Sequence, residues 1–176
     1  DILSGGRVIL GIGVGWLKEE FDVLGVPFEE RGARTDEFIQ IMRTMWTDDE
    51  PAFDGQFMQF KNAKSYPKPV QKPVPIVIGG HSEAAAKRAG RIAEGFYPYN
   101  AGDPEETLRL VQVMRDEAVR NGRDPDTIEL TTIAGRDMDA NKRFVDAGIH
   151  RIIVPPIGKT PEELRGFLDV VKSTLG

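Results

Sequence analysis

The sequence contains no cysteine, and this absence excludes disulfide bonds and metal sites built on thiolates. Its two histidines, His81 and His150, lie far apart in the chain and lack the spacing of metal ligands, so no metal site is expected. No apolar run approaches the roughly 20 residues that span a bilayer, and no signal-peptide pattern opens the chain. A cytoplasmic setting fits these absences best.

Clustered basic residues are lacking as well. The net charge is -5, and binding to a nucleic-acid backbone requires a stripe of Lys and Arg that neutralises phosphates. We therefore expect neither a nucleic acid nor a membrane as partner, which leaves a small-molecule substrate. Apolar and small residues are abundant: 40% of the residues are hydrophobic, with 19 glycines and 12 prolines, as in a single domain over residues 1–176 with many short connections.

Three glycines at alternate positions, Gly11, Gly13 and Gly15, look at first like a dinucleotide-binding loop. That loop needs the pattern Gly-x-Gly-x-x-Gly between a strand and a helix, whereas Trp16 occupies the position of its last glycine. The acidic residue expected about 20 positions later is also missing. The sequence therefore argues against a Rossmann-type nucleotide site at this stretch.

Apolar periodicity predicts strands that alternate with helices. An Asp54-Gly55 pair between short aromatic runs indicates a hairpin, and Thr35 is a plausible cap for the first long helix. The order amounts to about five β/α units, which predicts an α/β fold with helices lying on a parallel sheet. Strands are expected at 7–14, 74–78, 95–98, 128–133 and 151–155, and helices at 35–47, 82–93, 103–120, 141–147 and 160–174.

The most informative stretch is Gly79-Gly-His-Ser82, which follows the strand at 74–78 directly. Backbone amides freed by two glycines, followed by a hydroxyl at a helix start, make a good site for a phosphate. The alternative is a tight strand-to-helix turn without a ligand. Glu83 would repel a phosphate if it turned inwards, but an acidic residue in the first helical turn is also ordinary capping chemistry.

Four segments in order, Ser4–Trp16, Phe28–Phe38, Trp46 and Pro75–Gly80, together resemble the luciferase-like monooxygenase superfamily. Within it, the chain looks most like the branch that uses the deazaflavin coenzyme F-420 rather than FMN. The resemblance implies a (β/α)8 TIM barrel with its active site at the carboxyl ends of the strands. It also implies an oxidoreductase or monooxygenase that transfers hydride between the coenzyme and a small organic substrate.

The same resemblance implies roles for single residues. Gly13 and Gly15 would face the coenzyme ring, and Trp16 and Tyr97 would line the substrate pocket, although Trp16 could equally fill the core. No catalytic residue can be named. The coenzyme phosphate would be held by Gly79, Gly80, His81 and Ser82.

Charged residues near the first long helix have two interpretations. Arg31 and Arg34 either hold their loop through ion pairs or reach an acidic coenzyme tail, and the first interpretation is favoured. The acidic runs at 18–20 and 28–31 fit solvated helical faces, and no carboxylate pair has a spacing that demands acid-base work.

Residues Asp1–Gly6 have the pattern of a helix end with a glycine stop. The resemblance then implies that the first three β/α units of the barrel, and much of the ring-binding surface, are absent from this chain. A barrel with five of its eight strands would leave two open edges, so we expect a homo-oligomer. Two hypotheses remain: the carboxyl-terminal part of a flavin- or deazaflavin-dependent enzyme, or a non-catalytic half-barrel that binds a phosphate-bearing ligand or only self-associates.

Overall fold

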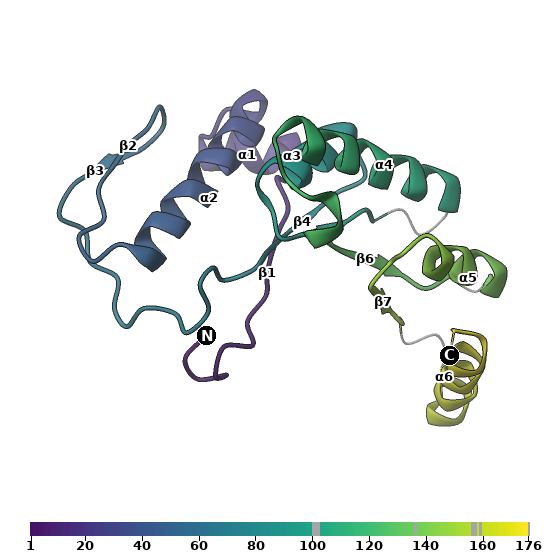
Figure 1. The fold of residues 1–176 in the computed structure, drawn as a ribbon. Coiled ribbons are helices and arrows are strands. Elements are labelled where there is room, and N and C mark those ends of the chain that lie inside the picture. The colour runs from purple at the N-terminus through teal and green to yellow at the C-terminus, as the bar shows by residue number, and fades with distance from the viewer. Residues whose placement is uncertain (100–102, 136, 156–157, 159, 176) are drawn as a thin grey trace. The chain divides into compact units, whose positions relative to one another are not determined.

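The computed structural model describes residues 1–99, 103–135, 137–155, 158 and 160–175. They fall into two compact units, Asp1–Pro75 and Ile76–Gly176, whose elements are labelled in Figure 1. The expectation of one domain over 1–176 stays a prediction. Within the described ranges, no helix combines the length and the apolarity that crossing a membrane would need.

The first unit begins with a glycine-terminated turn. Gly6 N–H donates to the Asp1 carbonyl over 2.8 Å and Gly5 N–H to the Ile2 carbonyl over 2.9 Å, while both glycines have positive φ. These are the two bonds of a Schellman motif, the usual end of a helix. The predicted glycine stop is therefore confirmed.

Strand β1 (Leu10–Ile12) is shorter than the predicted strand at 7–14. Leu10 N–H donates to the Pro75 carbonyl over 2.9 Å, but Val8 and Ile9 are 36% and 43% exposed. The nearly continuous apolar run at 7–14 suits a strand covered on both faces, but in this chain its residues before β1 are open to water. After β1, the short helix α1 (Lys18–Leu24) ends at Gly25, which has a left-handed backbone.

Helix α2 (Arg31–Thr47) follows the 3₁₀ turn Phe28–Glu30 and starts four residues before the predicted position. Thr35 is not its cap, because its hydroxyl donates to the Arg31 carbonyl over 2.8 Å inside the helix.

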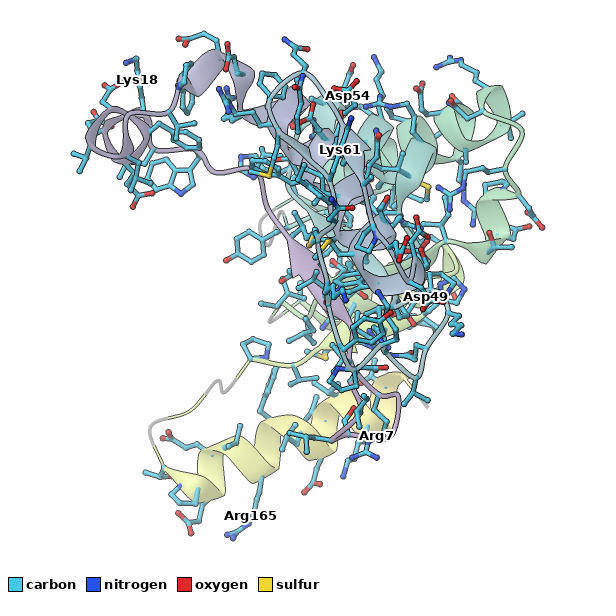
Figure 2. All side chains as sticks on the ribbon, turned by 90° about the vertical axis from the view of Figure 1, so that its left-hand side faces the viewer. Arg7, Lys18, Asp49, Asp54, Lys61 and Arg165 are labelled. Carbon is cyan, nitrogen blue, oxygen red and sulfur yellow. The ribbon has the colours of Figure 1, made fainter. Side chains whose placement is uncertain are left out.

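The predicted hairpin is confirmed: β2 (Phe53–Asp54) pairs antiparallel with β3 (Gln59–Phe60). Figure 2 shows charged side chains such as Lys18 on α1 and Arg165 on α6 (Pro161–Leu175) at the surface.

A buried carboxylate joins α2 to the tip of this hairpin. The side chain of Glu37, a residue only 8% exposed, accepts hydrogen bonds from the backbone N–H groups of Gln56, Phe57 and Met58 over 2.7–3.1 Å. A Cβ at Gly55 would lie 2.5 Å from the Glu37 carboxyl carbon, so the turn needs glycine there. The Glu37 carboxylate thus anchors the hairpin tip to α2.

We expect Glu37→Gln to destabilise the first unit, because an amide presents only one acceptor oxygen to three N–H donors. The loss should be about 2–3 kcal/mol, the scale of one charge-assisted hydrogen bond. Urea unfolding measures it, with the exposed Glu20→Gln as the matched control. Equal midpoints for the two variants would contradict the anchoring role.

The second unit is a parallel sheet with the strand order β4-β5-β6-β7. Each strand is followed by a helix, so the predicted α/β alternation is confirmed, and the strand bounds match the expected ones within two residues. The elements are β4 (Ile76–Gly79), α3 (Glu83–Ile92), β5 (Gly95–Tyr97), α4 (Pro104–Arg120), the 3₁₀ turn Pro125–Thr127, β6 (Glu129–Ile133), α5 (Met138–Asp146), β7 (Arg151–Ile153) and α6 (Figure 1).

Side-chain caps start the helices of this unit. Ser82 accepts from Ala85 N–H over 3.3 Å and Asp103 from Glu105 N–H over 3.0 Å. Thr160 and Glu163 exchange hydrogen bonds as a capping box. For α5, however, the cap is Asp137, and the predicted start at residue 141 is three residues late.

The two faces of the sheet differ because successive side chains alternate. One face is buried against the helices and carries Ile76, Ile78, Phe96, Leu130 and Thr132. We call the opposite face the inner face. The intervening positions lie on it, and they are Val77, Gly79, Gly95, Tyr97, Glu129, Thr131, Ile133, Arg151 and Ile153.

Helices α3 and α4 approach closely at Gly90. A Cβ there would lie 2.5 Å from the Met114 carbonyl oxygen and 3.0 Å from the Ala118 nitrogen, both of them backbone atoms. Behind this contact, the Arg123 guanidinium donates to the Gly90 carbonyl over 2.8 Å and to the Ala93 carbonyl over 2.6 Å. The carboxyl end of α3 is thus fixed against α4.

Gly90→Ala should destabilise the second unit by about 1–3 kcal/mol, because a methyl group that meets backbone atoms forces the helices apart. The same change at exposed Gly166 in α6, where a Cβ meets nothing within 4 Å, should instead stabilise by about 0.5–1 kcal/mol. Thermal unfolding of both variants provides the comparison. A stabilised Gly90→Ala variant would refute the close approach.

Candidate functional site

The carboxyl ends of β4 and β5 meet where the phosphate site was predicted. Gly79 is the register partner of Tyr97, and Gly80 N–H donates to the Tyr97 carbonyl over 3.1 Å. The Gly80 amide therefore extends the sheet ladder and is not free for a ligand, in contrast to the expectation that both glycines free their amides. Gly79, Gly80, His81, Ser82 and Tyr97 are nevertheless brought together.

The turn from β4 into α3 requires a glycine for its own geometry. Gly80 has φ +145°, and a Cβ there would lie 2.9 Å from the Ala85 methyl group. Ser82 caps α3 through its oxygen and retains its hydroxyl proton as a donor. Because the first N–H groups of a helix lack intrahelical acceptors, the amides that follow Ser82 are the donors that this end offers to an anion.

Glu83 is held by cations on the helix surface. Its carboxylate contacts Arg109 over 2.7 Å and Lys87 over 3.6 Å, and Arg109 also binds Glu106 over 2.6 Å. The hydrogen bond from Arg109, with the nearby positive charges, lowers the pKa of the Glu83 carboxyl. This arrangement supports the interpretation of Glu83 as ordinary first-turn chemistry, since its charge is already neutralised by neighbours.

The two histidines lie at opposite ends of their strands, one after β4 and the other before β7. His81 is exposed in the turn after β4, whereas His150 precedes β7 and its Nδ1 accepts from Leu130 N–H over 3.0 Å. In the part of the chain that the structure describes, no group of His, Asp and Glu side chains could hold a metal ion. The contact of His150 with Leu130 helps to join the start of β7 to β6.

The other predicted site residues lie in the first unit. Gly15 has φ +84°, and a Cβ there would come within 2.7 Å of the Phe21 ring, whereas a Cβ at Gly13 would meet nothing within 4 Å. Trp16 is 81% exposed, so the alternative that it fills the core is wrong for this chain. The roles of Gly13, Gly15 and Trp16 in binding a ring or substrate stay predictions.

Arg31 and Arg34 are engaged within the first unit. Arg34 pairs with Glu30 over 2.7 Å and stacks on the Phe57 ring, while Arg31 lies 3.8 Å above the Phe28 ring and donates to its carbonyl. These contacts favour the structural interpretation over a contact with an acidic coenzyme tail.

Trp46, which is part of the family resemblance, lines a cavity of about 350 Å³ together with Ile2, Leu10, Pro67 and Val74.

Sequence reasoning named Gly79 and Tyr97 but missed Thr131 and Arg151, which belong to the same row on the inner face. The register pairs Gly79 with Tyr97 and Thr131 with Arg151, and Tyr97 follows Phe96 just as Thr131 follows its partner Leu130. These four residues, which we call the inner row, therefore lie at one level across β4, β5, β6 and β7. Strand alternation was the signal that could have found Thr131 and Arg151, because all four residues hold inward-facing positions.

The members of the inner row differ in chemistry. Tyr97 packs edge-on against Tyr99, with ring centroids 5.8 Å apart, and burial together with Tyr99 raises the pKa of the Tyr97 phenol. Arg151 is neutralised by Glu129 over 2.6 Å. The inner row therefore has no side chain at Gly79, hydroxyls at Tyr97 and Thr131, and at Arg151 a cation that is already paired.

Comparison with known proteins decides the family. The sequence profile of luciferase-like monooxygenases matches residues 1–141. The chain belongs to the luciferase-like monooxygenase family. An uncharacterized protein of Mycobacterium tuberculosis is 40% identical over 155 residues, which are 86% of this chain and 52% of that protein. The chain spans about half the length of the curated relatives it matches.

Two relatives of this luciferase-like chain have informative names. The FMNH(2)-dependent dimethylsulfone monooxygenase of Pseudomonas putida is 33% identical over 178 residues, or 98% of this chain and 47% of that enzyme. The F420-dependent glucose-6-phosphate dehydrogenase of Amycolatopsis mediterranei is 43% identical over 99 residues, or 54% of this chain and 29% of that enzyme. Relatives thus use both coenzymes that the sequence suggested.

Solved structures show the fold. An F420-dependent secondary alcohol dehydrogenase aligns with a TM-score of 0.81 at 18% identity, covering 97% of this chain and 70% of that one. The coenzyme F420-dependent tetrahydromethanopterin reductase from Methanopyrus kandleri aligns with a TM-score of 0.76 at 18% identity, covering 94% and 73%. The predicted α/β fold of the TIM-barrel type is confirmed, and the chain carries part of it.

Proposed function

We propose that this luciferase-like chain serves an oxidoreductase or monooxygenase in which FMN or the deazaflavin coenzyme F-420 exchanges hydride with a small organic substrate. The observation that carries the proposal is the turn Gly79–Ser82 at the carboxyl end of β4, where α3 presents its N-terminal amides. Names of relatives support both coenzymes and leave the choice between them open.

The residues present fit a phosphate group. Gly79 and Gly80 place no side chain over the turn, Ser82 offers a hydroxyl, and the nearest carboxylate, Glu83, is neutralised by Arg109. The coenzyme, when bound, supplies the hydride chemistry. The residues of this chain would hold its phosphate at α3 and leave its ring toward the inner face, where Tyr97 can donate a hydrogen bond.

The second candidate function is a non-catalytic half-barrel that binds a phosphate-bearing ligand or only self-associates. It needs only the turn before α3, whose amides can hold a phosphate whether or not any chemistry follows. Coenzyme fluorescence detects binding in either case, whereas turnover of a substrate by this chain would support only the enzyme. The enzyme proposal also includes a small-molecule substrate and a cytoplasmic location.

The phosphate proposal predicts different effects on FMN binding for two substitutions at Ser82. Both Asp and Asn are good helix caps, so Ser82→Asp and Ser82→Asn should preserve α3. The Asp carboxylate would repel a phosphate, and we expect FMN to bind at least about tenfold more weakly, whereas Asn should bind FMN nearly as well as Ser. Fluorescence titration measures both.

Substitution of Gly80 is a poorer test, because any side chain there strains the turn whether or not a ligand binds. A Ser82→Asp variant that binds FMN as tightly as the Ser82→Asn variant would exclude phosphate from the α3 N-terminus.

Self-association is a separate prediction. Val8 and Ile9 before β1 and Ile153 in β7 are 36%, 43% and 42% exposed, and apolar strand residues left open to water favour pairing with another copy. Light scattering at low micromolar concentration should therefore report a mass above the 19.5 kDa of one chain. A monodisperse monomer would refute the prediction.

A further inference from the structure

Thr131 carries a polar group that the fold does not use. The residue is only 5% exposed, and its hydroxyl has no hydrogen-bond partner among the described residues. A buried hydroxyl without a partner is unfavourable, because it loses its bonds to water and gains none. Such groups in native proteins call for an explanation, and a bound ligand is one.

Other buried polar groups of the same unit show what satisfaction looks like. Asn141, which is fully buried, donates to the Gly135 carbonyl and accepts from the Gly135 N–H, both over 2.9 Å. The Thr131 hydroxyl can rotate freely, yet it finds no acceptor among the described residues. Asn141 clamps a loop within the protein. Thr131 instead belongs to the inner row, where a ligand could meet it.

The neighbours of Thr131 indicate what a ligand would present to it. On one side stands Tyr97, whose phenol is protonated and able to donate at neutral pH, and whose raised pKa only extends this range upward. On the other side stands Arg151, whose charge is neutralised by Glu129. The hydroxyls of Tyr97 and Thr131 are uncharged donors, and the one cation beside them is already paired. Such a pair of donors favours an uncharged acceptor such as a carbonyl or imide oxygen.

Shape supports the same conclusion. Gly79 occupies the β4 position of the inner row and leaves the sheet surface there without a side chain, so a flat ring can approach the backbone. A ring lying over Gly79 would direct one edge along the row toward Tyr97 and Thr131.

We propose that Tyr97 and Thr131 form a subsite that donates hydrogen bonds to an uncharged oxygen on the edge of a flat heterocyclic ring. The subsite deepens the proposed coenzyme function, on which it rests, and it is separate from the phosphate site at α3. Thr131 is the determining residue, because its hydroxyl has no other partner among the described residues.

Riboflavin and inorganic phosphate separate the two sites, since riboflavin carries the ring without a phosphate. We expect Thr131→Val to weaken riboflavin binding by the 176-residue chain roughly fivefold or more, the effect of one lost hydrogen bond. Thr131→Ser, which keeps the hydroxyl, should restore most of the affinity. Phosphate binding should be the same in all variants.

Thr107 provides a matched control. It is fully buried in α4, and its hydroxyl likewise lacks a partner among the residues described. Thr107→Val and Thr131→Val should both leave urea unfolding unchanged or shift it to higher urea, because neither removes a satisfied bond. Only Thr131→Val should affect riboflavin.

The outcomes are distinguishable. If the unchanged chain binds riboflavin but not inorganic phosphate, the phosphate site is refuted and the subsite still stands. The subsite is overturned if the unchanged chain does not bind riboflavin, if Thr131→Val binds it as tightly, or if that variant unfolds at clearly lower urea than Thr107→Val, since the hydroxyl would then serve the fold.

Discussion

The close approach of α3 to α4 is the constraint on which the second unit depends. Gly90 lets the two backbones touch, and the Arg123 guanidinium holds the last carbonyls of α3 from behind. With its carboxyl end fixed, α3 can begin at one place only, immediately after the turn that leaves β4. The position of its N-terminal amides is therefore set by packing at the far end of the helix, about ten residues away.

Much of this unit could be predicted from the sequence, because its signals are local. Apolar periodicity located the strands and helices, and Ser82, Asp103 and Thr160 marked helix starts with side chains that reach only two or three residues along the chain. The start of α5 was missed because Asp137 lies before the apolar pattern begins. The start of α2 was predicted too late because Thr35 was taken as its cap. A good cap residue also fits a helix interior when its hydroxyl donates to a carbonyl of the preceding turn.

Features that join distant residues could not be predicted from local pattern. Glu37 looks like any helical glutamate, and only the folded chain shows that its carboxylate collects the amides of a hairpin tip some 20 residues later. The use of the Gly80 amide also depends on a partner, the Tyr97 carbonyl on the next strand. Strand register decides such contacts, and register follows from packing of the whole sheet.

The two interpretations of the glycine turn need not compete. Gly80 is required by the turn itself, because a side chain there would strike Ala85, while Gly79 is a member of the inner row, where its missing side chain leaves the sheet surface open. One glycine thus serves the fold and its neighbour can serve a ligand. The same division separates Asn141, satisfied within the protein, from Thr131, whose hydroxyl has no partner in the described part of the chain. A polar group that the fold leaves unsatisfied, next to a position that the fold leaves empty, is the arrangement expected where a ligand completes the structure.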